Sequence, residues 1–235
     1  MFKEKLLKDA LRIYAGEHVL RRVLRLGAEA LELNHGRRIM TVMSISPQTS
    51  DEYYRDLSPI QSRDGLREFH AQVINVIERN AGIVDGFIGD EVIAYFGRED
   101  DFDHAAAAIA SAAELSSIVV LPQKSNLNAS MYPFIGVDTG FVFIGNFGTT
   151  TRMKFTVMGD VVNMSSRLLN RCRTFRVKVL ITNSTVRAAR QTPVLSLLEI
   201  GEIEVSGTKV KVSTLEGQLP DTSLVSRPTE PRPDS

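Results

Sequence analysis

The chain has 235 residues, 43% of them hydrophobic, which is enough to build the core of one large domain. Its 28 basic and 28 acidic residues cancel, so no overall charge draws it to nucleic acid or to an anionic membrane. A single cysteine, Cys172, excludes an intramolecular disulfide and a thiolate metal cluster, and it favours a reducing, cytoplasmic location. No run approaches the ~18 apolar residues of a membrane span, so we expect no transmembrane helix.

Residues 1–36 are predicted to form a helical leader in two pieces. Apolar residues recur at helical spacing within 6–14 and again within 19–31, with an interruption near Gly16. Such an amphipathic segment either packs on the rest of the chain or pairs with a partner helix. The sequence leaves both arrangements open.

Residues 37–217 are predicted to form one domain of alternating strands and helices. The first elements expected are a buried strand over 38–46 ended by Pro47, a polar loop over 47–56, a helix over 59–80, two short strands within 83–97, a helix over 104–120, and a hairpin over 132–147 turning at Asp138-Thr139-Gly140. A helix carrying Asn163 and Arg167 follows, and then strands over 177–182, 197–206 and 209–216.

The order of these elements predicts an α+β fold. Strand, helix and hairpin occur in βαββαβ order, which is the ferredoxin-like plan, here with extra C-terminal strands. In this plan an antiparallel-rich sheet is covered by helices on one face. Residues 218–235 hold four of the nine prolines and few apolar residues, so we expect a disordered tail.

The most informative motif is the stretch 155–167, Phe-Thr-Val-Met-Gly-Asp-Val-Val-Asn-Met-Ser-Ser-Arg. It places Asn163 and Arg167 one helical turn apart, so their side chains share a face. An amide beside a guanidinium can bind a sugar oxygen and a phosphate together. The structural alternatives are a helix-capping Asn163 and a surface ion pair for Arg167.

Together with two upstream motifs, this stretch resembles the catalytic domain of the class III adenylate and guanylate cyclases. The upstream motifs are Gly86-Phe-Ile-Gly-Asp-Glu-Val-Ile-Ala-Tyr-Phe-Gly97, and Ile135-Gly-Val-Asp-Thr-Gly140 followed by Ile144-Gly-Asn-Phe-Gly148. The resemblance implies the class III cyclase fold and a dimer of two cyclase domains with each active site at their interface. It also implies attack of the ribose 3′ oxygen of ATP on the α-phosphorus, release of pyrophosphate, and two Mg or Mn ions as cofactors.

The resemblance also assigns roles to single residues. Asn163 would orient the ribose and Arg167 would hold the α-phosphate. Asp90, between the two short strands, takes the position of one metal-binding aspartate. Ser46 stands where the other is expected, and a neutral hydroxyl is a weak ligand for a hard dication. The metal site is therefore predicted to be incomplete, with Asp51 or Glu52 as the only nearby replacements.

Substrate recognition is predicted to be altered as well. Gly86 stands where the family has a lysine that reads adenine, so this position is degenerate: it has no side chain that could donate a hydrogen bond to the base. Thr156 takes the second base-reading position and is compatible with adenine. The family also has a lysine that binds the triphosphate, and its position is occupied in this chain by Ser206 or Thr208. Lys209 or the nearby Lys211 is the candidate to replace it.

Three functions follow from this pattern. The first is the Asn/Arg-donating half of a heterodimer with a metal-competent cyclase domain, since Ser46 weakens the metal half while Asn163 and Arg167 are intact. As a homodimer such a chain would be very slow or inactive. The second is a pseudocyclase without turnover that serves as a dimerisation or nucleotide-sensing module. The third is a weakly active homodimeric adenylate cyclase that uses manganese.

Overall fold

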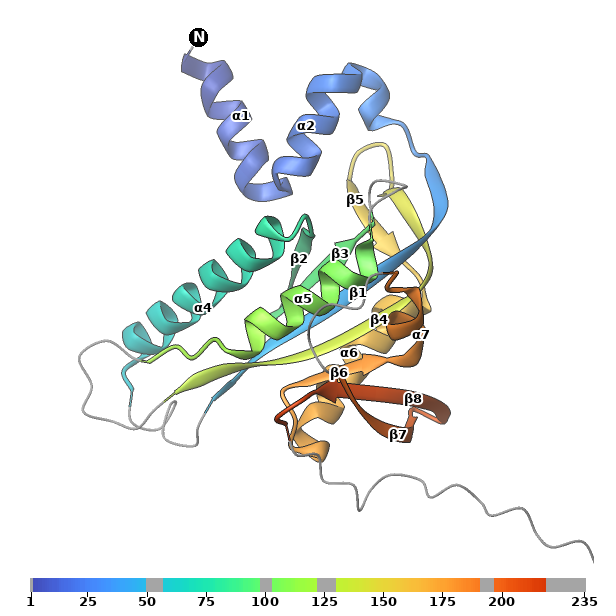
Figure 1. The fold of residues 1–235 in the computed structure, drawn as a ribbon. Coiled ribbons are helices and arrows are strands. Elements are labelled where there is room, and N and C mark those ends of the chain that lie inside the picture. Colours follow the sequence, from blue (N-terminus) through green and yellow to red (C-terminus); the bar gives the residue numbers. More distant parts are fainter. Residues whose placement is uncertain (1, 50–56, 98–102, 122–129, 191–196, 219–235) are drawn as a thin grey trace, which may run out of the picture.

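The computed structural model describes residues 2–49, 57–97, 103–121, 130–190 and 197–218 of the chain (Figure 1). An eight-stranded sheet forms its centre, with strand order β2-β3-β1-β4-β6-β8-β7 and with β5 paired to β4. The strands are β1 His35–Thr49, β2 Ile83–Ile88, β3 Glu91–Phe96, β4 Met131–Gly148, β5 Met153–Met158, β6 Val179–Thr182, β7 Leu197–Val205 and β8 Thr208–Leu215. The helices are α1 Phe2–Ala15, α2 Glu17–Leu26, the 3-10 helix η1 Gly27–Leu31, α4 Pro59–Arg79, α5 His104–Ser116, α6 Asp160–Phe175 and α7 Asn183–Ala188.

The longest ladder of the sheet joins β1 to β4. It pairs the two strands antiparallel and without a break, from His35 opposite Gly145 to Thr49 opposite Met131. The elements β1, α4, β2, β3, α5 and β4 follow one another in the chain, so the predicted βαββαβ order and the α+β fold are confirmed.

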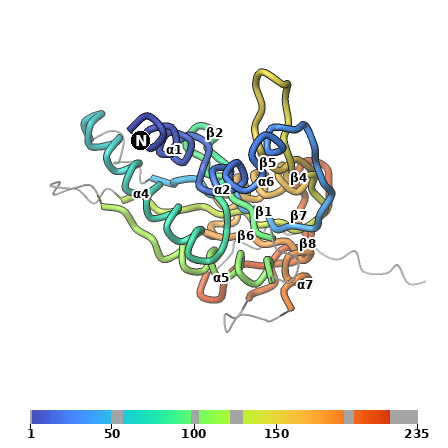
Figure 2. Tube along the Cα trace, turned by 90° about the horizontal axis from the view of Figure 1, so that it is seen from above, coloured from blue at the N-terminus to red at the C-terminus, as the bar shows by residue number. Residues whose placement is uncertain are grey.

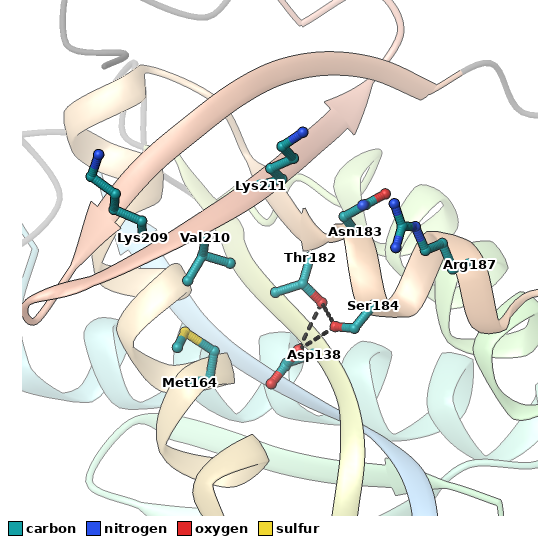
Figure 3. A pocket seen from close by; sticks show the side chains of 9 residues that line it. All are labelled: Asp138, Met164, Thr182, Asn183, Ser184, Arg187, Lys209, Val210 and Lys211. Carbon is teal, nitrogen blue, oxygen red and sulfur yellow. Dashed lines mark hydrogen bonds between the residues drawn. The ribbon is translucent and has the colours of Figure 1, made fainter. Parts of the chain in front are cut away.

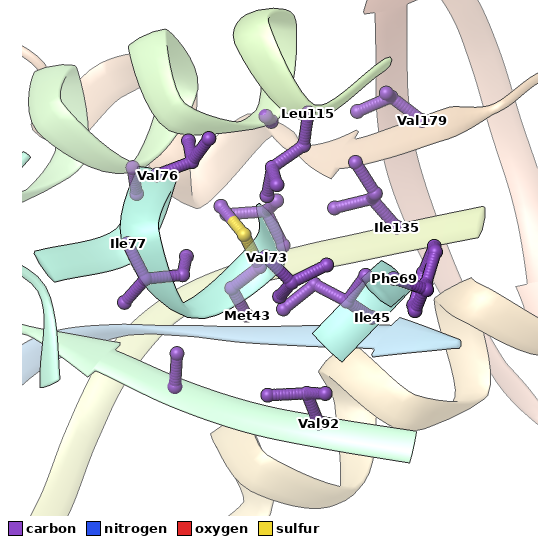
Figure 4. Packing of buried hydrophobic residues seen from close by; sticks show 14 of the residues in the cluster. Met43, Ile45, Phe69, Val73, Val76, Ile77, Val92, Leu115, Ile135 and Val179 are labelled. Atoms are coloured by element: carbon purple, nitrogen blue, oxygen red, sulfur yellow. The ribbon is translucent and has the colours of Figure 1, made fainter. Parts of the chain in front are cut away.

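Helices cover both faces of this sheet. On one face of the sheet lie α4 and α5 (Figure 2). Alternate residues of β1 and β4 such as Met43, Ile45 and Ile135 pack against them in the main core (Figure 4). On the other face lies α6, so close to β4 that a Cβ built on Gly136 would stand 2.0 Å from the carbonyl oxygen of Ser165. The expectation that helices cover one face only is therefore wrong, because α6 packs on the second.

The predicted hairpin turn at Asp138-Thr139-Gly140 does not exist. These residues lie in the middle of β4, opposite Val42, Thr41 and Met40 of β1, and the chain turns only at 149–152. A turn-like sequence stays extended here because the Asp138 and Thr139 side chains find hydrogen bonds inside the protein instead of in a turn.

Two element boundaries differ from prediction, and two elements were not predicted. Strand β1 continues through Pro47, which lies opposite Pro133, to Thr49. The ladder between β1 and β3 has ended by then, so the missing N–H of Pro47 removes no bond to β3. Helix α5 ends at Ser116 instead of residue 120, and β5 and α7 were not predicted.

A chain of hydrogen-bonded hydroxyl groups crosses the interior between α5, β1, β4, α7 and β6. In order it joins His104, Thr41, Thr139, Thr185, Thr182 and Asp138, with distances of 2.8, 2.8, 2.9, 3.1 and 2.7 Å. Thr139 donates its one proton to Thr185, so it must accept from Thr41, and Thr41 must accept from Nδ1–H of His104. The network therefore fixes the tautomer of His104.

The helical leader forms in two pieces, as predicted, and its second piece packs on the domain. Leu20 of α2 is buried, and the guanidinium of Arg22 lies 4.9 Å from the centre of the Phe155 ring. At the end of the leader, the side-chain amide of Asn146 donates to the carbonyl oxygens of Ala30 and Glu32 at 2.8 and 2.6 Å. Helix α1 packs on α2 but has no buried residue, and most of its large apolar side chains are exposed, namely Phe2, Leu6, Leu7, Ile13 and Tyr14.

Two further expectations concern the whole chain. Cys172 is completely buried, and burial raises the pKa of its thiol to about 12, as expected for an unreactive packing residue. Within the described ranges, no helix has the length and apolar character needed to cross a membrane.

The environment of His104 makes stability depend on pH. Burial lowers the pKa of His104 below its ordinary value, and the charge of Arg190 lowers it further, against the opposing effect of Asp103. The unfolded chain therefore binds the proton more readily, so stability is lost as pH falls below about 6.5. We expect the free energy of unfolding, measured in urea, to fall less between pH 8 and pH 5 for His104→Asn than for the wild-type protein. The asparagine keeps a hydrogen-bond donor to Thr41 but cannot titrate. Equal pH slopes for the two proteins would contradict this assignment.

Candidate active site

Asn163 and Arg167 lie on the exposed side of α6. The opposite side of the helix is fixed by the buried residues Ser165, Leu168 and Cys172. The helix is capped by Gly159 without a side-chain hydrogen bond, so Asn163 is not its cap. Among the described residues, neither Asn163 nor Arg167 makes a side-chain hydrogen bond or ion pair. The described residues therefore support neither a helix-capping role for Asn163 nor a surface ion pair for Arg167. The amide and the guanidinium lie one helical turn apart and are accessible to a ligand.

Ser46 and Asp90 come to the same end of the sheet. The ladder between β1 and β3 ends at the pair of Ile45 and Val92, so Ser46 follows directly on one strand while Glu91 and Asp90 precede on the other. Asp90 is exposed in the turn between β2 and β3, and its carbonyl oxygen lies 3.4 Å from Nε2 of His70. Among the residues that the structure describes, the Ser46 hydroxyl makes one long contact, of 3.4 Å, to the carbonyl oxygen of Pro47.

Glu91 is a carboxylate that the sequence analysis did not single out. Alternation along β3 and β1 places it on the α6 face of the sheet, the face on which Ser44 bonds Ser165. One of its oxygens accepts from the Ser166 hydroxyl at 3.1 Å, while Oε1 is buried and has no hydrogen-bond partner in the described part of the chain. Its position next to the Gly-Asp turn was visible in the sequence, but its orientation required the strand register.

The described residues do not fit a pair of magnesium ions. Such a site needs hard anionic oxygens that the two ions share. Here the aligned residues are one exposed carboxylate, Asp90, and one neutral hydroxyl, Ser46. Nowhere in the described ranges do three His, Cys, Asp or Glu side chains gather as a metal ion would require. Asp51 and Glu52, the replacements considered from sequence, lie outside those ranges.

Gly86 and Thr156, which the resemblance predicts to contact the base, come together around the carboxylate of Asp85. Thr156 donates its hydroxyl proton to Oδ2 of Asp85 at 2.8 Å, and the Lys154 ammonium lies 2.5 Å from the same oxygen. A Cβ built on Gly86 would meet that ammonium nitrogen at 3.2 Å. Lys154 of β5 therefore lies beside Gly86 of β2, the position at which the resemblance leads us to expect a lysine.

Lys209 lies at the rim of a cleft of about 430 Å³ between α6, α7 and β8 (Figure 3). Two further cations, Arg187 and Lys211, line the same cleft, and Asp138 lies at its floor, bound by the hydroxyls of Thr182 and Ser184. Burial raises the pKa of Asp138. Lys209 itself lies 3.5 Å from Glu202 in an exposed ion pair, so a role in binding phosphate stays a prediction.

Two proteins named as adenylate cyclases are similar to this chain in sequence. The adenylate cyclase of Anabaena cylindrica is 28% identical over 195 residues, which are 81% of this chain and 39% of that protein. The terminal-differentiation adenylate cyclase of Dictyostelium discoideum is 32% identical over 126 residues, 53% of this chain and 6% of that protein. The chain thus spans less than half the length of these relatives.

Solved structures of cyclases share the fold. The adenylyl cyclase CyaB of P. aeruginosa superposes with a TM-score of 0.64 at 23% identity, covering 78% of this chain and 96% of that one. A bacterial light-regulated adenylyl cyclase superposes with a TM-score of 0.74 at 20% identity, covering 92% of this chain and 63% of that one. Residues 36–217 match the family described as the adenylate and guanylate cyclase catalytic domain, and the chain belongs to that family.

Proposed function

We propose that this chain is the half of a nucleotidyl cyclase dimer that supplies Asn163 and Arg167, and that it relies on a second cyclase domain for the paired metal carboxylates. The observation that carries this proposal is the contrast between the two ends of the site. Asn163 and Arg167 are exposed on a rigid helix and unengaged among the described residues, whereas the strand end that should hold two carboxylates offers Ser46 beside Asp90.

In the proposed reaction, the ribose 3′ oxygen of ATP bonds to the α-phosphorus and loses its proton, while the bond to pyrophosphate breaks. Asn163 would hold the ribose so that this oxygen faces the phosphorus. Arg167 would donate hydrogen bonds to the α-phosphate as negative charge develops there. Because the residues that the structure describes do not fit two metal ions, the proposal assigns the metal chemistry to the partner domain.

Complementation tests the proposal directly. The full chain is mixed with a metal-competent cyclase domain whose own Asn and Arg are replaced by alanine, and cyclic AMP is measured. We expect product in the mixture and at most trace amounts from either protein alone. In this chain Arg167→Ala should lower the rate about 100-fold or more, because it removes a donor that acts on the transition state. The matched control Arg171→Ala, one turn further along α6, should keep the rate, and a mixture without product would refute the proposal.

Restoring the missing carboxylate is a second test. If Ser46 is the defect, Ser46→Asp in the full chain should raise homodimer turnover of ATP about tenfold or more, which corresponds to about 1.4 kcal/mol of transition-state stabilisation. The isosteric but neutral Ser46→Asn serves as the control and should give no gain. The gain should also vanish in the double variant with Asp90→Ala. Equal rates for the aspartate and asparagine variants would show that the carboxylate is not what limits this chain.

A second candidate, a slow homodimeric cyclase, is favoured by the unpartnered oxygen of Glu91 near Ser46. In that case Glu91 would stand in for the missing carboxylate, and manganese would suit its irregular position better than magnesium. Purified protein should then form cyclic AMP slowly from manganese-ATP, and Glu91→Gln should lower that rate about tenfold or more. Product formation that survives both Glu91→Gln and Asp90→Ala would rule out this assignment of ligands. Nucleotide binding without any turnover would favour the pseudocyclase.

A further inference from the structure

The cleft between α6, α7 and β8 is separate from the candidate active site. The described residues that line it come from five elements, and they include neither the pair of Asn163 and Arg167 nor Asp90 (Figure 3). Its volume of about 430 Å³ falls in the range of small-molecule sites. The cleft therefore has room for a second ligand, one that the proposed reaction does not involve.

The rim of this cleft carries an excess of positive charge. Its three cations, called the rim cations below, are Arg187 of α7 and Lys209 and Lys211 of β8 (Figure 3). In the described part of the chain, Lys209 has one anionic partner, Glu202 at 3.5 Å. Arg187 and Lys211 make no side-chain hydrogen bond or ion pair with the described residues. Two uncompensated cations that line one space favour a doubly charged anion.

A carboxyl group at the floor of the cleft adds a condition on that anion. Oδ1 of Asp138 accepts from the hydroxyls of Thr182 and Ser184 at 2.7 and 2.9 Å, so an added proton belongs on Oδ2. Burial raises the pKa of Asp138, which favours this proton. An ionised Asp138 would repel an anion, whereas the protonated acid carries no charge. Binding of an anion in the cleft is therefore coupled to proton uptake by Asp138.

The surroundings of Asp138 identify it as the group that titrates with binding. Opposite it on β1 lies Val42, and α6 contributes Met164 to the cleft. Among the described residues, the charged groups that α7 and β8 add are the rim cations, with Glu202 of β7 beside one of them. His104 connects to Asp138 through the chain of hydroxyl groups, and its Nδ1–H donates into that chain whether or not Nε2 carries a proton. Protonation of His104 therefore leaves the hydrogen bonds of Asp138 unchanged.

An apolar wall lies beside the charged rim. Met164 of α6 and Val210 of β8 both line the cleft, and both pack on the second core cluster, which contains Leu168 and Cys172. A bare phosphate ion would leave most of the cleft volume empty. A ligand with an organic part would cover Met164 and Val210 and gain free energy from the apolar surface that it buries.

We propose that this cleft binds a small phosphomonoester beside a protonated Asp138. Its phosphate would lie between Arg187 and Lys211. Its organic part would cover the apolar wall. A phosphomonoester carries two charges on one group near neutral pH, because its second pKa lies near 6. A guanidinium binds phosphate oxygens in pairs, and a lysine adds a point charge.

This site does not depend on the proposed function. Lys209 and Lys211 are both candidates for the lysine that binds the triphosphate, and the proposal assigns only Lys211 to the second ligand. Arg187 and Asp138 have no part in the proposed reaction. The cleft can therefore be tested without turnover.

Isothermal titration calorimetry of the full chain tests the site, with phenyl phosphate as the probe. Phenyl sulfate is the control ligand, since it has nearly the same shape and one charge less. We expect phenyl phosphate to bind about tenfold or more tightly than phenyl sulfate, and more tightly than inorganic phosphate, which cannot cover the apolar wall. Arg187→Ala and Lys211→Ala should each weaken phenyl phosphate about fivefold or more. The matched control Arg190→Ala removes a cation just beyond α7 and outside the cleft, and it should leave binding unchanged.

The carboxyl group at the floor supplies a pH test. Between pH 8 and pH 6.5 phenyl phosphate keeps most of its second charge, so its binding should tighten about threefold or more as the pH falls and Asp138 takes up its proton. Asp138→Asn is neutral at every pH and keeps an oxygen that accepts from Thr182 and Ser184. This variant should bind at pH 8 at least as tightly as the wild type does at pH 6.5. Its binding should show almost no dependence on pH.

The outcomes separate this site from the candidate active site. Equal binding of phenyl phosphate and phenyl sulfate refutes the doubly charged ligand, and unchanged binding in Arg187→Ala refutes the cleft. If Arg167→Ala weakens phenyl phosphate as much as Arg187→Ala does, the ligand lies in the active site and the proposal is wrong. A pH dependence that persists in Asp138→Asn refutes the role of Asp138, and if that variant does not fold, the rim variants decide. A complementation mixture without cyclic AMP would refute the proposed function alone.

Discussion

The unbroken antiparallel ladder between β1 and β4 is the constraint on which the rest of the structure depends. It fixes which residues of β1 face α4 and α5 and which face α6, because side chains alternate strictly along both strands. A slip of one residue would turn Met43 and Ile45 away from the main core and bring Ser44 into it. The same register carries Ser46 to the strand end beside the turn of Asp90. The position of the candidate site is thus a consequence of how the core is packed.

Much of this could be predicted from the sequence, and the failures have physical causes. The helix with Asn163 and Arg167 and the short strands around Gly89 follow from local periodicity and turn residues. The long strand β4 could not be found in this way, because Asp138 and Gly140 resemble a turn and only the buried threonines around them keep the chain extended. Asp85 and Lys154 were missed for a similar reason. They are 69 residues apart, and nothing local to either residue indicates that they meet.

The two ends of the candidate site differ in how they are held. Asn163 and Arg167 project from a helix whose other side is fully buried, so their backbone positions are fixed by packing with Leu168 and Cys172. Asp90 lies in an exposed turn, and a carboxylate there depends on a neighbour to hold a cation. In the proposed function, the chain keeps the half that packing supports, and Ser46 leaves the other half in need of a second carboxylate. This asymmetry is the physical basis for expecting a division of labour between two subunits.

Strand β5 also links the leader to the contact that Lys154 and Thr156 make with Asp85. Phe155 lies between Lys154 and Thr156 in the sequence, so its side chain points to the opposite face of the strand, where Arg22 of α2 stacks on it. Asn146, paired with Phe155 across β4 and β5, anchors the end of the leader as well. A single strand cannot shift one face without the other. We therefore expect a rotation of α2 against the domain to displace Phe155 and, with it, the two side chains beside it.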